Sequence, residues 1–305
     1  MTHPPVVILG PTASGKSDVA MHVAQVVRGT EIIAVDAMMV YRGMDIGTGK
    51  PSAADQNQIP HHCLDVADAS ERFTVADYQS HANEALVSIN SRDGHALLVA
   101  GTGMYLQAVI DGFTLPGEFP EIRAELESLP VEELFGRLSD VDPEAAAKIE
   151  PTNSRRLVRA LEVCLGSGRR FSSFGPGANV YPPTEFRQIG ILWPRPELAH
   201  RIEVRVHSMI EAGWVEEVRK LLAMPVPMSL TARQALGYKE LIAHVEGHMS
   251  LEQAVAETIL RTRQFAVRQE RWFRRDPRID WVNVDAGENL VEQVAPKVLN
   301  CLGRN

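Results

Sequence analysis

Residues 10–17 read Gly-Pro-Thr-Ala-Ser-Gly-Lys-Ser, which is the pattern G-x-x-x-x-G-K-[ST]. They follow a short apolar run, Val6–Leu9, that predicts a buried strand, and they precede residues 18–27, which predict a helix. In that setting the two glycines let backbone N–H groups turn into one concavity, and the start of the helix adds a positive dipole end. The stretch therefore predicts a site for a diphosphate or triphosphate.

All eight residues of this phosphate loop are expected to bind the diphosphate: Gly10, Pro11, Thr12, Ala13, Ser14, Gly15, Lys16 and Ser17. The ammonium of Lys16 provides a point charge for the outer phosphate. The hydroxyl of Ser17 can hold a hydrated Mg²⁺ ion, so Mg²⁺ is the expected cofactor and Ser17 its expected ligand.

The composition is that of a globular protein. The 305 residues are 45% hydrophobic and 23% charged, which suits one large domain or two ordinary ones. No apolar run approaches the ~20 residues that cross a bilayer, and the first predicted strand leaves no room for a signal peptide. The cysteines, Cys63, Cys164 and Cys301, lie far apart, which argues against a zinc knuckle or a disulfide framework. We expect a cytoplasmic, monomeric protein without a membrane partner or an obligate protein partner.

The charge pattern leaves two interpretations open. A net charge of -8 argues mildly against a nucleic-acid partner, but arginines cluster at residues 155–170 and 261–275. Such clusters are typical of a site for a polyanion. The second interpretation, which the charge pattern favours less, is that they are two solvated helix faces.

Strands and helices alternate through the first third of the chain. Strands are predicted at residues 6–9, 31–35 and 95–100, and helices at 18–27, 75–90 and 104–110. This order predicts the α/β class, a P-loop-type parallel β-sheet flanked by helices. Ligands of such sheets bind at the carboxyl ends of the strands, so the loops at 10–17, 36–41 and 101–103 should meet in one crevice.

The pattern changes near Phe113, where prolines separate short helical pieces. We interpret residues 113–186 as a helical insertion domain. Residues 1–112 and 187–305 then form the P-loop-like catalytic core. A strand at 188–193 resumes that core, and helices are predicted at 196–212, 215–222 and 251–273.

A phosphate loop alone leaves kinases, other NTPases and GTPases open. Asp36, at the end of the second predicted strand, narrows the choice, because a carboxylate there can bind Mg²⁺ or accept a proton from a substrate. No later apolar strand ends in an aspartate as a Walker B strand does, and the guanine-reading Asn-Lys-x-Asp is absent.

Stretches along nearly the whole chain resemble the IPP transferase family, the tRNA dimethylallyltransferases. They are the phosphate loop, Asp36–Pro51 (DAMMVYRGMDIGTGKP), Ile59–His62 (IPHH), Gly101–Tyr105 (GTGMY), Asp142–Val163 (DPEAAAKIEPTNSRRLVRALEV), Leu236–Glu240 (LGYKE) and Thr262–Phe273 (TRQFAVRQERWF). The chain stops without the zinc module of eukaryotic relatives, which suggests the bacterial type.

The resemblance implies a prenyl transferase. Such an enzyme moves a dimethylallyl group from dimethylallyl diphosphate to N6 of adenosine-37, in tRNAs that read codons beginning with U, and releases pyrophosphate. Lys16 and Arg205 would contact the diphosphate and Thr102 the target adenosine. Asp36 would take the N6 proton as the catalytic base.

The resemblance also implies that the insertion domain clamps the anticodon stem-loop. The expected tRNA-binding residues are Asp36, Ala37, Met38, Met39, Thr102, Arg123, Arg155, Arg156, Arg159, Gln234, Gly237, Tyr238 and Lys239. Two of them depart from the family pattern. Ala37 stands where the family usually has serine, and Met39 stands where glutamine is common.

Three alternatives stay open at this point. One is an isopentenyl transferase acting on free adenine nucleotides, as in cytokinin synthesis, and another is a P-loop small-molecule kinase. The third is an RNA-binding module that keeps its phosphate loop as a relic, against which the intact Lys16, Ser17 and Asp36 argue.

Overall fold

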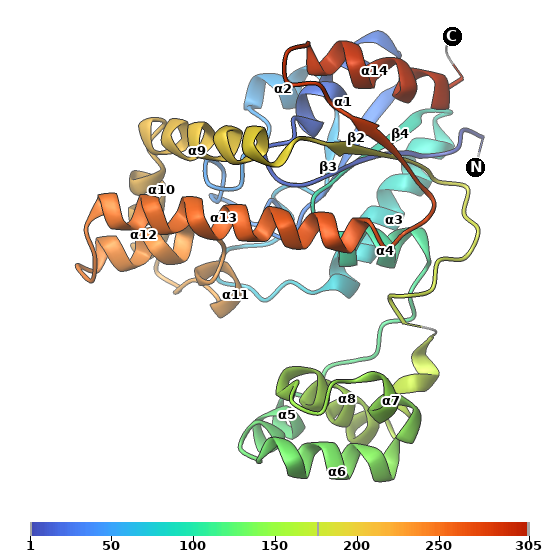
Figure 1. Cartoon of the computed structure of the whole chain (residues 1–305), viewed down its shortest axis with the longest axis vertical. Coiled ribbons are helices and arrows are strands. Elements are labelled where there is room, and N and C mark those ends of the chain that lie inside the picture. The colour runs from blue at the N-terminus through green and yellow to red at the C-terminus, as the bar shows by residue number, and fades with distance from the viewer. Residues whose placement is uncertain (1, 176, 304–305) are drawn as a thin grey trace. The chain divides into compact units, whose positions relative to one another are not determined.

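The computed structural model describes residues 2–175 and 177–303, and it divides the chain into two compact units (Figure 1). Residues up to Ile110 and from Pro183 onward form the first unit, and Asp111–Pro182 form the second. The sequence placed the insertion at 113–186, so its two boundaries differ from these by two and four residues.

Within the described residues, six parallel strands form the sheet of the first unit. They are β1 (Val6–Leu9), β2 (Thr30–Val35), β3 (His61–His62), β4 (His95–Ala100), β5 (Arg187–Leu192) and β6 (Ile279–Asn283), in the spatial order β3-β2-β4-β1-β5-β6. The strand before the phosphate loop, β1, lies between β4 and β5, with Val6 opposite both Leu97 and Arg187. The predicted α/β class is thus confirmed.

Side chains alternate between the two faces of the sheet, as the period of two in a strand requires. Val6 and Ile8 pack into one core with helices α1 (Lys16–Val26) and α14 (Leu290–Cys301). Val7 and Leu9 pack into another with α3 (Val75–Ser91) and α4 (Gly103–Ile110). All four side chains of β1 are fully buried, because helices cover both faces of the sheet. This explains why the strand is a continuous apolar run without alternating polar residues.

The other helices of the first unit surround the carboxyl edge of the sheet. They are α2 (Ala53–Gln58), α9 (Arg195–Glu211), α10 (Trp214–Leu222), α11 (Leu230–Arg233), α12 (Tyr238–Val245) and α13 (Leu251–Phe273). Helix α13 begins at a capping box formed by Ser250 and Gln253 and runs beside α9 (Figure 1). An ion pair of 2.6 Å between Arg263 and Glu203 joins these two helices.

The predicted strands and helices of the core are present, with ends shifted by one or two residues. The elements that were not predicted lie where local signals are weak. Strand β3 has only two residues, and β6 is an edge strand with one buried side chain out of five. Helix α14 contains Pro296, which normally argues against a helix interior.

The second unit is a small helical bundle. Its helices are α5 (Pro120–Glu127), α6 (Val131–Val141), α7 (Pro143–Lys148) and α8 (Ser154–Ser167), followed by a 3₁₀ turn at Phe171–Phe174. Leu134 and Leu138 of α6 pack against Leu157 and Leu161 of α8, at the spacing of one helix face.

A carboxylate fixes the entry into this bundle. Glu162 is fully buried and accepts hydrogen bonds from the backbone N–H of Phe119 at 2.7 Å and from Arg123 at 2.7 Å. Arg159 lies 3.1 Å from the same carboxylate. Burial opposes ionisation of Glu162, but these donors outweigh it and hold its pKa below the usual value. The resulting stabilisation is present at neutral pH and lost as the pH falls through the folded-state pKa.

We expect Arg123→Ala to destabilise the second unit by about 3 kcal/mol, because it leaves the buried Glu162 short of one partner. Arg155→Ala is the matched control, since Arg155 is exposed on the same bundle and its loss should change stability by less than about 0.5 kcal/mol. Thermal and urea unfolding of the full chain would measure both. Equal stability of the two variants would contradict the role given to Glu162.

Candidate active site

A cavity of about 280 Å³ lies at the carboxyl edge of the sheet. Its walls include Lys16 of the phosphate loop, Asp36 after β2 and Gly101 after β4, together with Arg205 of α9 and Gln269 of α13. The three loops that the sequence predicted to converge therefore do so.

One aromatic and one cationic side chain hold the phosphate loop through hydrogen bonds to its backbone carbonyls. The indole N–H of Trp193 donates to the Ser14 carbonyl at 3.0 Å, and Nε of Arg201 donates to the Ala13 carbonyl at 2.9 Å. Gly15 has a φ of 80° at the turn into α1, a left-handed conformation in which a side chain would be strained. The loop is thus shaped before any ligand binds.

Lys16 points its ammonium back over this loop. Nζ donates to the Pro11 carbonyl at 2.8 Å, and the group is enclosed although the residue as a whole keeps some exposed surface. Burial, and next the nearby Arg205 guanidinium, lower the pKa of Lys16 to about 7, while the more distant Asp36 opposes the shift. Among the described residues, no carboxylate forms an ion pair with this ammonium. When it is protonated, Lys16 therefore adds to the site a positive charge that is not neutralised by an ion pair.

Arg205 adds a second cation from α9. Its guanidinium packs so closely on Gly49 that a Cβ there would lie 2.0 Å from Nη2. Burial lowers the pKa of Arg205, and the carboxylates of Asp36 and Asp18 oppose the shift. Two enclosed cations beside a helix start favour a ligand with several negative charges.

The Asp36 carboxylate is oriented by its own turn. Oδ1 accepts hydrogen bonds from the backbone N–H groups of Met38 at 2.8 Å and Met39 at 3.2 Å. The N–H of Ala37 donates to Oγ1 of Thr102 at 3.3 Å, which joins this turn to the loop after β4. The carboxylate and the Thr102 hydroxyl are therefore held on adjoining loops of one site.

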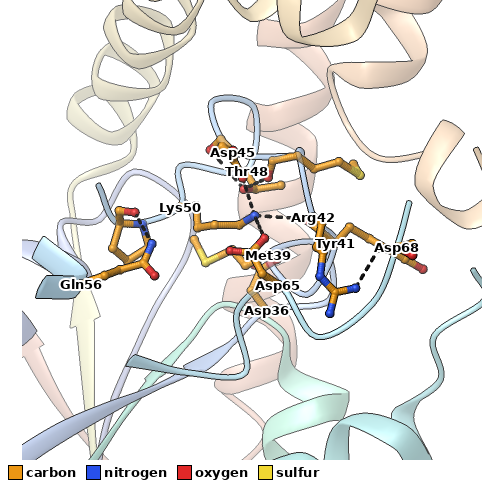
Figure 2. A network of polar contacts seen from close by, with 12 residues as sticks. Asp36, Met39, Tyr41, Arg42, Asp45, Thr48, Lys50, Gln56, Asp65 and Asp68 are labelled. Atoms are coloured by element: carbon orange, nitrogen blue, oxygen red, sulfur yellow. Dashed lines mark hydrogen bonds and ion pairs between the residues drawn. The ribbon is translucent and has the colours of Figure 1, made fainter. Parts of the chain in front are cut away.

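The segment that follows Asp36 is stiffened by a buried lysine. Figure 2 shows Lys50 between Asp45 and Asp65, with its ammonium 2.6 Å from Asp65 and 2.9 Å from the Tyr41 carbonyl. The Lys50 side chain is 3% exposed. Because its charge is neutralised by two carboxylates, it stabilises the loop and is not available to a ligand.

Glu217 of α10 fixes the same segment from the other side. Its carboxylate accepts the N–H groups of Asp45 at 2.9 Å and Ile46 at 2.7 Å, as well as the hydroxyl of Tyr238 at 2.6 Å. Tyr238 is 1% exposed, and a Cβ on Gly237 would lie 2.0 Å from the Trp214 ring. Gly237 and Tyr238, which were predicted to contact tRNA, are thus buried and pack within the first unit.

The other predicted tRNA-binding residues divide into three groups. Arg155, Arg156, Gln234 and Lys239 are exposed. Arg123 and Arg159 are engaged by Glu162, and Arg159 also donates to the Pro116 carbonyl at 2.8 Å. Near the cavity, Met39 lines the wall, whereas Ala37 and Met38 pack against the core.

Half of the arginines in the second cluster form ion pairs with glutamates. On α13, Arg261 lies 2.6 Å from Glu257, Arg274 lies 2.7 Å from Glu270, and Arg263 pairs with α9. These contacts favour the solvated-face interpretation for residues 261–275.

Gln269 is a site residue that the sequence did not predict. Its side chain is 7% exposed and contacts two of the three site loops, with Nε2 donating to the Gly101 carbonyl at 2.7 Å and Oε1 accepting the Thr12 N–H at 2.9 Å. Gln269 belongs to the quoted stretch 262–273, but nothing local distinguishes a glutamine that faces two distant loops from one that faces water.

In residues 2–175 and 177–303, no group of three or more His, Cys, Asp and Glu side chains is placed to hold a metal ion. No helix in the same ranges is both long and apolar enough to cross a bilayer.

We expect Lys16→Met to raise the melting temperature of the ligand-free protein by a few degrees, which corresponds to about 1 kcal/mol. The lowered pKa means that the unfolded state binds more protons than the folded state between about pH 7 and 10, so the buried charge costs stability. The gap between variant and wild type should narrow as the pH rises through this range. The same change should weaken binding of an alkyl diphosphate at least tenfold by calorimetry. A lower melting temperature with unchanged affinity would contradict this account of Lys16.

This chain is similar to known proteins along most of its length. A family model described as IPP transferase matches residues 39–276. A tRNA dimethylallyltransferase of Kineococcus radiotolerans is 42% identical over 98% of this chain and 96% of the relative, and one of Geobacter metallireducens is 44% identical over 91% of each.

Solved structures agree as well. The full-length tRNA isopentenylpyrophosphate transferase of Bacillus halodurans is 36% identical, with a TM-score of 0.71 over 99% of this chain and 97% of that one. A eukaryotic dimethylallyltransferase has a TM-score of 0.82 over 97% of this chain and 78% of that one; at 24% identity it supports the fold alone. The chain belongs to the IPP transferase family.

Proposed function

We propose that this enzyme transfers a dimethylallyl group from dimethylallyl diphosphate to N6 of adenosine-37 in tRNAs that read codons beginning with U. The observation that carries the proposal is the enclosure of Lys16 and Arg205 in the same cavity as the oriented carboxylate of Asp36. One half of the cavity suits a leaving diphosphate and the other a base. The close relatives named tRNA dimethylallyltransferase support the same reaction.

The chemistry follows from this division. Nitrogen attacks the allylic carbon, a C–N bond forms, and the C–O bond to the diphosphate breaks in line with it. Lys16, Arg205 and the N–H groups of the phosphate loop stabilise the charge that develops on the leaving pyrophosphate. Asp36 takes the proton that N6 loses. Because an exocyclic adenine amine is a weak nucleophile, a positioned base is needed.

Mg²⁺ is part of the proposal. Ser17 is an exposed residue that lines the cavity, and a hydroxyl is an oxygen ligand of the kind that Mg²⁺ accepts. Ser17 would hold the ion together with diphosphate oxygens and water. When bound, Mg²⁺ supplies further neutralisation of the diphosphate charge.

We also propose the anticodon stem-loop as the form of tRNA that is recognised. Arg155 and Arg156 of the second unit, and Gln234 and Lys239 of the first, are exposed side chains suited to phosphates and base edges. The target adenine must leave its stack before Asp36 can reach N6. A monomeric state and a cytoplasmic location belong to the same proposal.

We expect Asp36→Asn to lower kcat by about 10²- to 10⁴-fold, because it removes the proton acceptor. Asparagine keeps an oxygen for the N–H groups of Met38 and Met39, so the turn and the affinity for the stem-loop should be retained. Single-turnover transfer and filter binding would measure the two effects. If turnover survives in a variant that still binds the stem-loop, Asp36 is not the base.

The proposed reaction is tested by a transfer assay with radiolabelled dimethylallyl diphosphate, Mg²⁺ and the full chain. We expect label on an anticodon stem-loop with adenosines at positions 36 to 38, and no label when only adenosine-37 is replaced. A parallel tube contains AMP in place of RNA. Label on AMP would move the enzyme to the nucleotide-prenylating class, and label on neither substrate would refute the proposal.

A further inference from the structure

Gln269 uses both ends of its side-chain amide inside the cavity wall. Nε2 donates to the carbonyl of Gly101 at 2.7 Å, and Oε1 accepts the backbone N–H of Thr12 at 2.9 Å. The orientation of the amide is fixed, because turning it over would place N–H against N–H and oxygen against oxygen. With the residue 7% exposed, water cannot readily replace these contacts.

The two partners of Gln269 belong to different halves of the site. Thr12 lies in the phosphate loop, and Gly101 directly precedes Thr102, whose Oγ1 accepts the N–H of Ala37. A Cβ on Gly101 would lie 3.5 Å from both Asp36 Oδ2 and Gln269 Nε2, so the Gly101 backbone lies between these two side chains. One amide thus connects the diphosphate half to the half that holds the base.

Helix α13 holds this amide in place through its neighbours on the same face. Phe265, one turn earlier, lines the cavity. Trp272, one turn later, packs against Gly103 so closely that a Cβ there would lie 2.1 Å from its ring. Residues at spacings of three and four lie on one side of a helix, so α13 contacts the phosphate loop and the loop after β4 as one rigid element.

We infer that Gln269 is a positioning residue, which sets the separation between the bound diphosphate and the Asp36–Thr102 pair for in-line transfer. The inference rests on the proposed function, because only a two-substrate transfer needs these loops in register. Reacting atoms must approach to roughly 3–3.5 Å, and a misplacement of about 1 Å can cost about a hundredfold in rate.

The test compares three variants of the full chain by steady-state transfer kinetics. Gln269→Met removes both hydrogen bonds at similar volume and should lower kcat by ten- to a hundredfold, with the KM for each substrate raised less than kcat falls. Gln264→Met, an exposed glutamine on the same helix, is the matched control and should match wild type. Gln269→Glu keeps the shape of the side chain and tests the two hydrogen bonds separately, because an ionised carboxylate can make only one of them.

The ionised side chain of Gln269→Glu can accept the Thr12 N–H but cannot donate to the Gly101 carbonyl. Once protonated it can do both, as the amide does, and burial favours the protonated form. The activity of Gln269→Glu relative to wild type should therefore rise severalfold from pH 8 to pH 6, whereas that of Gln269→Met stays flat. The groups lining the same cavity, Lys16, Asp18, Asp36, Asp55, His61 and Arg205, are common to all variants and cancel in this ratio.

Hydrogen–deuterium exchange tests the same inference without turnover. Gln269→Met should speed exchange in peptides covering residues 10–17 and 101–105, and Gln264→Met should not. Unchanged exchange in both loops of Gln269→Met would overturn the inference, and so would a kcat of Gln269→Met within twofold of wild type. So would a fall in stability with no change in kcat and no acid rescue of Gln269→Glu. A wild-type chain that transfers nothing would instead defeat the proposed function.

Discussion

The enclosed ammonium of Lys16 is the constraint on which the site depends. It lies beside a second cation, Arg205, and its hydrogen bond goes to the neutral carbonyl of Pro11. Burial penalises the charged form of such a group, and the Asp36 carboxylate offsets this penalty only in part. A polyanion removes that penalty on binding. The electrostatics of the site thus favours a ligand with several negative charges.

The parallel sheet makes this arrangement possible. Its strands end at one edge, where the loops after β1, β2 and β4 converge, and side chains from later in the chain then fix them. Trp193 and Arg201 hold the back of the phosphate loop, and Glu217 and Lys50 hold the loop that follows Asp36. Each of these side chains makes a hydrogen bond to backbone, which for Lys50 goes to the Tyr41 carbonyl and adds to its ion pairs with Asp45 and Asp65. These contacts fix the shape of the loops without occupying the cavity.

The sequence predicted those features of the fold and the site for which nearby residues form a recognisable pattern. The phosphate loop, Asp36 after its strand and the α/β class could all be predicted, because each has a signal within about ten residues. Gln269 could not, since its partners lie 257 and 168 positions away. The contacts of Arg123 and Tyr238 with carboxylates elsewhere in the chain could not be predicted for the same reason. An exposed side chain and a buried one look alike in a sequence, and only packing shows that Arg123 donates to Glu162 and Tyr238 to Glu217.

Proton uptake on binding an alkyl diphosphate is the most direct test of this account. Calorimetry at pH 8 in buffers of different ionisation enthalpy would measure it for wild type and Lys16→Met with methyl diphosphate, whose own last pKa, near 6 as for a phosphate ester, keeps it ionised. With a pKa of about 7, Lys16 is mostly neutral in the free protein at this pH and should take up close to one proton on binding. Lys16→Met should take up almost none. Equal uptake by the two proteins, or none by wild type, would contradict the claim that the diphosphate binds at the charge of Lys16.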